Sequence, residues 1–193
     1  MIRMAAEPDI PAILDIYAPY VENTVYSFEY SAPTLPVFTQ RFQTITERFP
    51  WLVWEEDGKV LGYAYGSAPF HRAAYNWCAE VSIYIAPSAQ GKGIGRRLYA
   101  ALEQLLALQG FQVVYSIVSS GNSASLAFHK AVGYRFLAEF PACGFKHNRW
   151  HGIIWLEKRL SSVDIPTQMP IPWKDFVKNH RNLANILDIL TLS

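Results

Sequence analysis

The residues best suited to bind an anion lie in one glycine-rich segment, Gln90–Arg97. The segment follows an apolar run, 77–85, that is typical of a buried strand, and it precedes apolar residues at helical spacing. Such a turn directs several free backbone N–H groups at one point, and the positive end of the helix dipole adds to their attraction for an anion. Gly91, Gly93 and Gly95 lack the side chains that would keep a phosphate away. We therefore predict a diphosphate site.

Two common phosphate-binding motifs do not fit this segment. A P-loop needs a Ser or Thr hydroxyl to hold magnesium, whereas Gly95 is followed by Arg96 and Arg97. A dinucleotide-binding Gly-x-Gly-x-x-Gly normally opens the first βαβ unit and precedes an acidic ribose ligand, and neither condition is met cleanly. Lys92 adds positive charge to that of the two arginines. A glycine-rich turn that only caps a helix remains the alternative.

The segment Gln90-Gly91-Lys92-Gly93-Ile94-Gly95 resembles the acetyl-CoA signature Q/R-x-x-G-x-G/A of the GNAT N-acetyltransferases. Further short matches resemble the phosphinothricin N-acetyltransferase branch, which also holds the acetyltransferases of methionine sulfone and methionine sulfoximine. These matches include 50–53, 62–65, 79–80, 133–134, 144–147 and 150–151. They extend over about residues 1–160. The resemblance implies acetyl transfer from acetyl-CoA to a free amine, and an α/β fold with a mixed, mostly antiparallel sheet flanked by helices.

Glu80 is the candidate general base of such a reaction. It stands inside an otherwise apolar strand, where loss of water would raise the pKa of its carboxyl group and suit it to take a proton from the amine. The resemblance assigns the same role to the glutamate of the Ala79-Glu80 step. A structural acid paired with a cation such as Arg72 is the alternative.

His129 is the candidate proton donor to the departing thiolate. The helix that carries it, about 123–132, ends with the word Phe128-His129-Lys130, where many GNAT enzymes have a tyrosine and the phosphinothricin branch also has a histidine. A histidine satisfied at the helix surface is the alternative. Asn122 matches the family's cofactor-contacting asparagine, and taken alone it is an ordinary helix N-cap.

The resemblance places the cofactor along the strand before the glycine-rich turn. The backbone of Ile83, Tyr84 and Ile85 would lie beside the pantetheine arm like an added strand, and one of its N–H groups would stabilise the oxyanion. The predicted acetyl-CoA site therefore comprises Ile83, Tyr84, Ile85, Gln90, Gly91, Lys92, Gly93, Ile94, Gly95, Arg96 and Asn122.

The candidate substrate residues are fewer. The carboxylate of an α-amino acid needs a cation, and Arg72 in the loop before Glu80 is the best candidate. Phe28 and Tyr84 could wall the pocket for the side chain. The herbicide-resistance enzymes of this branch have an arginine after the matching phenylalanine, whereas this chain has Glu29. This departure is closer to the methionine-derivative enzymes.

Composition limits the other classes of function. Hydrophobic residues make up 51% and charged residues 17% of the 193 residues, which favours one globular domain. A net charge of +1 gives no reason to expect nucleic acid or a membrane surface as partner. We expect a cytoplasmic protein, because we find no signal peptide and no apolar run of membrane-spanning length. Two cysteines, Cys78 and Cys143, are too few for a disulfide framework.

The His147 and His151 pair does not predict a metal site, because it lies on turn and strand without a third ligand. Apolar spacing and turn residues predict the remaining elements. We expect strands at 2–5, 51–56, 60–67, 77–85, 113–118, 134–140 and 150–158, and helices at 10–21, 36–48, 94–109 and 123–132.

The last part of the chain, 161–193, lies outside the resemblance. It combines a proline-containing linker with an amphipathic helix from Trp173 to Leu190. We divide the chain into an acetyltransferase domain, 1–160, and this segment, and we expect the helix to pack on the domain or on a second subunit. The branch is typically dimeric, which implies a homodimer through strands near 140–158.

The sequence thus predicts an N-acetyltransferase that moves an acetyl group directly, in a ternary complex, to a small amino acid-like amine. Two alternatives remain open. The amine could be of another kind, such as a polyamine, an antibiotic or a protein N-terminus. The chain could also be a non-catalytic acyl-CoA-binding module in which Glu80 and His129 are inert.

Overall fold

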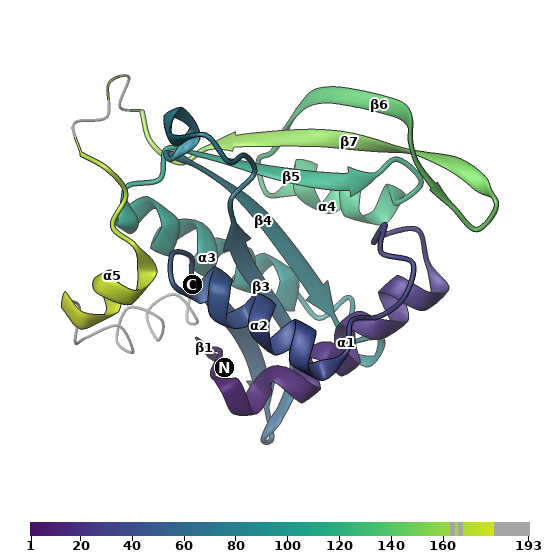
Figure 1. The fold of residues 1–193 in the computed structure, drawn as a ribbon, viewed down its shortest axis with the longest axis horizontal. Helices are drawn as coiled ribbons and strands as arrows, with labels where there is room; N and C mark the ends of the chain where they lie inside the picture. The colour runs from purple at the N-terminus through teal and green to yellow at the C-terminus, as the bar shows by residue number, and fades with distance from the viewer. Residues whose placement is uncertain (163–164, 166–167, 180–193) are drawn as a thin grey trace.

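The computed structural model describes residues 1–162, 165 and 168–179, which form a seven-stranded sheet with helices on both faces (Figure 1). The strands are β1 (Ile2–Met4), β2 (Trp51–Glu56), β3 (Lys59–Ser67), β4 (Cys78–Ile85), β5 (Val113–Ser119), β6 (Arg135–Lys146) and β7 (Arg149–Arg159). The sheet order is β1-β2-β3-β4-β5-β7-β6, and among these described strands only β4 and β5 pair in parallel. The predicted mixed, mostly antiparallel sheet is confirmed.

Two layers of helices cover the sheet. The helices are α1 (Ile10–Asn23), α2 (Leu35–Thr46), α3 (Ile94–Gln109), α4 (Ser123–Ala131) and α5 (Trp173–Asn179). Figure 1 shows α1 and α2 in front of the sheet and α3 and α4 behind it. The front layer encloses an aromatic cluster around Trp51, Tyr63 and Phe38, and the back layer buries the leucines of α3. Both faces of the central strands are therefore apolar, as their sequences indicate.

The last two strands differ from the sequence prediction. Strands were expected at 134–140 and 150–158, but β6 continues to Lys146 and β7 begins at Arg149, so that the two form one long hairpin. Its turn, His147–Asn148, has φ angles of 50° and 59°. Pro141 and Gly144 indicate the end of a strand in sequence. Here β6 is an edge strand, and it accommodates both residues through a shift in register between Phe140 and Gly144.

The short helix α5 packs on the body of the protein. Trp173 and Phe176 are buried in the same cluster as the leucines of α3. The Gln109 side chain, at the end of α3, donates to the carbonyl oxygens of Arg48 (3.0 Å) and Ile171 (2.8 Å). The expected packing of this helix on the domain is confirmed for its described part. The predicted continuation to Leu190 lies outside the described residues.

Truncation of the buried face of α5 should destabilise the whole domain. We expect Phe176→Ala to lower the free energy of unfolding by about 3 kcal/mol, because it leaves a cavity in the core. The matched control is Val177→Ala on the same helix, since Val177 is 42% exposed and should contribute little. Urea unfolding of the two variants measures the difference. Equal midpoints would show that α5 is not part of the cooperative core.

Candidate active site

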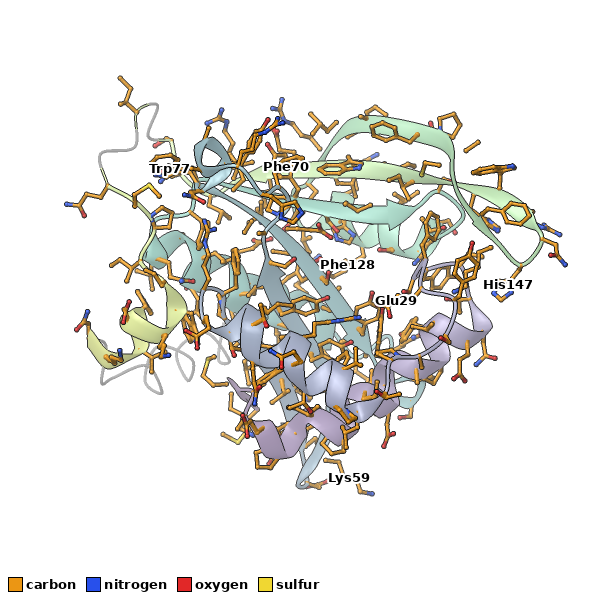
Figure 2. The ribbon with its side chains drawn as sticks, in the orientation of Figure 1. Glu29, Lys59, Phe70, Trp77, Phe128 and His147 are labelled. Atoms are coloured by element: carbon orange, nitrogen blue, oxygen red, sulfur yellow. The ribbon has the colours of Figure 1, made fainter. Side chains whose placement is uncertain are left out.

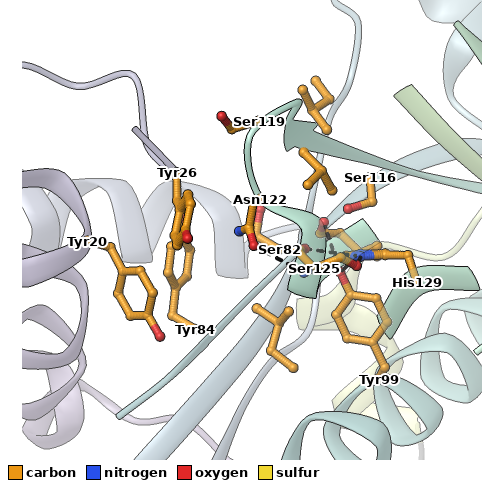
Figure 3. A pocket seen from close by; sticks show the side chains of 14 residues that line it. Tyr20, Tyr26, Ser82, Tyr84, Tyr99, Ser116, Ser119, Asn122, Ser125 and His129 are labelled. Atoms are coloured by element: carbon orange, nitrogen blue, oxygen red, sulfur yellow. Dashed lines mark hydrogen bonds between the residues drawn. The ribbon is translucent and has the colours of Figure 1, made fainter. Parts of the chain in front are cut away.

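The strands β4 and β5 separate in the middle of the sheet. They pair only through Cys78 with Val113, Ala79 with Val114 and Glu80 with Tyr115, although β4 continues to Ile85. A cavity of about 80 Å³ lies where they part. Side chains from β4, β5, α1, α3 and α4 reach it, among them Ser82, Tyr99, Ser116, Asn122 and His129 (Figure 3). The edge of β4 beyond Glu80 therefore faces an opening rather than a strand.

A larger groove of about 520 Å³ lies along the beginning of α3. Gly91 and Gly93 have φ angles of 75° and 78°, in the left-handed region that glycine adopts freely, and a Cβ atom on either would meet nothing within 4 Å. A Cβ atom on Gly95 would lie 3.5 Å from Ile83 and from Phe128, inside the groove. The backbone is therefore open to a large ligand at the end of a helix where N–H groups favour a phosphate. These residues fit the diphosphate end of acetyl-CoA.

The structure places most of the predicted cofactor residues around this groove. Its lining includes Ile83, Ile85, Gln90, Gly91, Gly93, Ile94, Gly95, Arg96 and Asn122. Tyr84 lines the smaller cavity, whereas Lys92 is exposed and lines neither space. Asn122 caps α4 as expected, because its side-chain oxygen accepts a hydrogen bond from the backbone N–H of Ser125 at 3.1 Å.

Two tyrosines of the site were missed in the sequence. Tyr20 and Tyr26 line both the cavity and the groove. The Tyr20 hydroxyl donates to the carbonyl oxygen of Ile85 at 2.6 Å and accepts from the Gln90 side chain at 2.9 Å. Tyr20 thereby ties α1 to the end of β4 and to the glycine-rich turn. It continues the apolar stripe of α1 that contains Ile13 and Tyr17, so helical spacing describes it only as a residue that packs on the core.

His129 is held by hydrogen bonds at both ring nitrogens. Its Nδ1 lies 2.7 Å from the carbonyl oxygen of Ser125, which can only accept, so Nδ1 carries the proton. Its Nε2 therefore accepts from the Tyr99 hydroxyl at 3.0 Å (Figure 3). The side chain is 2% exposed, and burial lowers the pKa of its imidazole. The alternative, in which His129 lies at the helix surface, is therefore wrong. Tyr99 is a further site residue that the sequence did not indicate.

Glu80 lies on the opposite side of the sheet from the groove. Side chains alternate along β4, so Glu80 shares a face with Ser82 and Tyr84, whereas Ala79 and Val81 point into the core behind. Burial raises the pKa of the Glu80 carboxyl, and its negative charge contributes to the raised pKa of Tyr65 and of Tyr84. The ion pairs found among the described residues do not include Glu80. The alternative, a structural acid paired with a cation such as Arg72, thus finds no such pair among the described residues.

The structure does not bring the other substrate candidates to these cavities. Arg72 is exposed in the loop between β3 and β4, and Phe28 contacts Gly144 of the β6–β7 hairpin. Neither lines the cavity or the groove. Their roles in substrate binding remain predictions. Within residues 1–162, 165 and 168–179 no three His, Cys, Asp or Glu side chains are grouped to hold a metal ion.

Comparison with known proteins gives a consistent family. The model of the acetyltransferase (GNAT) domain matches residues 2–155. The chain is 36% identical to a phosphinothricin N-acetyltransferase of Alcaligenes faecalis, over 84% of each chain. It is 33% identical to the L-methionine sulfoximine/L-methionine sulfone acetyltransferase of Pseudomonas aeruginosa, over 82% of this chain and 94% of that one.

A solved structure supports the same relationship. The phosphinothricin acetyltransferase of Sinorhizobium meliloti in complex with acetyl-CoA superimposes with a TM-score of 0.84 at 34% identity, over 90% of this chain and 96% of that one. The chain belongs to the GNAT acetyltransferase family. It is an acetyl-CoA-dependent N-acetyltransferase, as the sequence predicts.

Replacement of Glu80 should separate catalysis from folding. We expect Glu80→Gln to lower kcat by roughly a hundredfold or more, as loss of a general base does. A base acts in its ionised form, so wild-type activity should fall as the pH drops through the raised pKa of Glu80. This acid limb should be missing from the variant. Steady-state rates measured across pH test both expectations.

The stability of the same variant is the control. The folded-state pKa of Glu80 lies above its unfolded value, so folding disfavours the ionised form, and stability from this carboxyl is lost as pH rises through the folded pKa. Glu80→Gln should therefore be at least as stable as the wild type at neutral pH. A destabilised variant with normal turnover would make Glu80 a structural acid.

Proposed function

We propose that this enzyme acetylates the free amine of a small amino acid-like substrate of the methionine sulfoximine, methionine sulfone or phosphinothricin type. The opening between β4 and β5 is the observation that carries the proposal. The cavity in this opening shares Tyr26 and Ile83 with the glycine-lined groove, and it is also lined by Ser82 and Tyr84 from the face of β4 that bears Glu80. An acetyl group held in the opening is accessible to an amine from the front. Transfer is direct, within a ternary complex, and needs no acetyl-enzyme.

The residues of the opening divide the proton transfers between them. Glu80, desolvated and without an ion pair among the described residues, accepts the proton of the amine. His129 is neutral and accepts a hydrogen bond from Tyr99, so it orients the Tyr99 hydroxyl. We assign protonation of the leaving thiolate to the Tyr99 hydroxyl, which turns its proton from His129 Nε2 to the sulfur in that step. Backbone N–H groups of β4 near Ile83 serve the developing oxyanion.

The front face favours a substrate with an uncharged side chain. The Glu29 carboxylate accepts hydrogen bonds from Tyr17 (2.9 Å) and Arg41 (2.7 Å), and its charge contributes to the raised pKa of Tyr84. It therefore lies close to the wall of the cavity. A phosphinate anion bound there would meet the Glu29 carboxylate, whose charge Arg41 offsets in part. We infer that methionine sulfoximine and methionine sulfone are better substrates than phosphinothricin, and that Arg72 receives the substrate carboxylate.

A panel of amines tests the substrate class. Release of free thiol from acetyl-CoA is measured with methionine sulfone, methionine sulfoximine, phosphinothricin, spermidine and a peptide N-terminus. We expect the two methionine derivatives to exceed spermidine in kcat/KM by about a hundredfold, since binding without the proper polar contacts loses several kcal/mol. A preference for spermidine or the peptide would show that the enzyme acts on another class of amine. Binding of acetyl-CoA without turnover of any amine would support the non-catalytic module.

We also propose that residues 1–160 are the catalytic domain and that the remaining segment supports it from outside the active site. The cytoplasm is the proposed location. Cys78 and Cys143 are both free thiols, which suits a reducing compartment. None of the helices in the described ranges is both long and apolar enough to cross a membrane.

The exposed aromatic residues of the β6–β7 hairpin support a homodimer. Phe136, Phe140 and Trp150 are 62%, 48% and 63% exposed, and β6 is an edge strand of the sheet. Exposed aromatic side chains on an edge strand and on the strand beside it are typical of an interface. We propose that a second copy of the chain covers this hairpin.

Light scattering tests the dimer. We expect twice the mass of one chain for the wild type, and the mass of a single chain for Phe140→Glu, because the substitution places a charge in the proposed interface. Leu108→Glu is the control, since Leu108 is 53% exposed on α3, away from the hairpin. A wild-type protein that runs as a monomer at micromolar concentration would contradict the proposal.

A further inference from the structure

Lys146 is a buried lysine that has no role in the activity described so far. It is the last residue of β6, and its side chain is 3% exposed. Its ammonium group donates to three backbone carbonyl oxygens, those of Val21 (2.6 Å), Thr24 (2.9 Å) and Ser27 (2.7 Å). An ammonium has three donors, so all of them are used. Its position is therefore tightly specified.

The three carbonyl groups belong to one short region of the chain. Val21 lies in the last turn of α1, where carbonyl groups lack helical partners and the dipole favours a cation. Thr24 and Ser27 lie in the segment that follows, which we call the 24–30 loop. No ion pair found in the described part of the chain involves Lys146. Its charge is balanced by backbone oxygens rather than by a carboxylate.

Further contacts join the 24–30 loop to the β6–β7 hairpin. Phe28 packs so closely on Gly144 that a Cβ atom there would lie 2.1 Å from the phenyl ring. The Tyr30 hydroxyl donates to the carbonyl oxygen of Phe145 at 2.7 Å. His151 Nε2 lies 2.9 Å from the carbonyl oxygen of Lys146 and so holds the lysine backbone in place. Figure 2 shows the tip of the hairpin at His147 beside the part of the molecule that carries Glu29.

The other side of the 24–30 loop faces the active site. Tyr26 lines both the cavity and the groove. Glu29 is held by Tyr17 and Arg41 and lies near Tyr84. The loop is thus a wall of the amine site, and its place depends on contacts with the β6–β7 hairpin.

We propose that Lys146 is a positioning residue of the amine site, which fixes the 24–30 loop at the distance from β4 that substrate binding requires. The inference rests on the proposed function, in which the 24–30 loop forms a wall of the amine site. The 24–30 loop gives only Tyr26 to the cofactor groove, whereas the glycine-rich turn that lines the groove belongs to other elements. Loss of the ammonium group should therefore affect the amine far more than acetyl-CoA.

The test compares Lys146→Met with Lys59→Met. Methionine keeps most of the length of the side chain but leaves three buried carbonyl groups without a donor. Lys59 is an exposed lysine at the start of β3 and serves as the control. We expect KM for methionine sulfone to rise by roughly tenfold or more in Lys146→Met, as displacement of a positioning element does. The dissociation constant for acetyl-CoA, measured by calorimetry, should stay within about threefold of the wild type.

Hydrogen exchange of the backbone amides gives a second measurement that does not depend on activity. Exchange within residues 24–30 should become faster in Lys146→Met and stay unchanged in Lys59→Met. Unchanged exchange in this loop would overturn the proposal, and so would faster exchange with an unaltered KM. If the wild type acetylates no amine of the panel, the proposed function fails. The exchange comparison then still decides whether Lys146 holds the loop.

A second pair of variants covers the case in which Lys146→Met does not fold. Gly144→Ala keeps the lysine and displaces Phe28, because the added methyl group would overlap the ring. Gly121→Ala is its control, since a Cβ atom on Gly121 meets nothing within 4 Å. We expect a raised KM for the amine and faster exchange of the loop in Gly144→Ala alone. Identical behaviour of the two variants would contradict the inference.

Discussion

The separation of β4 from β5 is the constraint on which the site depends. A strand edge without a partner leaves backbone groups that must be satisfied in another way. At one end of the open edge the Tyr20 hydroxyl of α1 donates to the carbonyl oxygen of Ile85 at 2.6 Å; at the other end the Tyr99 hydroxyl of α3, whose proton goes to His129, lies 3.4 Å from the carbonyl oxygen of Val81. The backbone groups of Ile83 lie between these two carbonyl groups on the same edge, because the backbone groups of alternate residues in a strand point to the same side. The protein thus leaves the middle of the edge for a ligand that pairs like a strand.

The two faces of the opening differ in how they interact with negative charge. Behind the sheet, open backbone at Gly91 and Gly93 and the N-terminal end of α3 attract an anion without any buried charge. In front, Glu80 is a carboxylate whose raised pKa comes from loss of water. Because the sheet lies between them, the glycine-lined groove and the Glu80 carboxyl group are kept apart, and neither environment weakens the other. Under the proposed function, the opening between β4 and β5 would let both act on one acetyl group.

Local patterns explain which parts of this arrangement the sequence could predict. The glycine-rich turn is recognisable because its chemistry depends on residues that are adjacent in the chain, and the same holds for Asn122 as an N-cap. Tyr20 and Tyr99 act through contacts 65 and 18 residues away, and helical spacing describes both only as helix residues. The full length of β6 was missed because Pro141 and Gly144 indicate a break, which only the register shift of an edge strand resolves. Long-range pairing, not local preference, determined what was missed.

The helix α3, which begins at the groove, is stabilised at its C-terminal end. Its N-terminus forms part of the groove, while Gln109 at its last turn donates to Arg48 and Ile171 and accepts from the backbone N–H of Ile171 at 2.8 Å. Trp173 and Phe176 bury against the same apolar face of the helix. A helix transmits such support along its axis because its backbone is hydrogen-bonded throughout. The described part of the C-terminal segment therefore supports the helix whose first turn forms the predicted phosphate site, just as we propose that the β6–β7 hairpin supports the amine site.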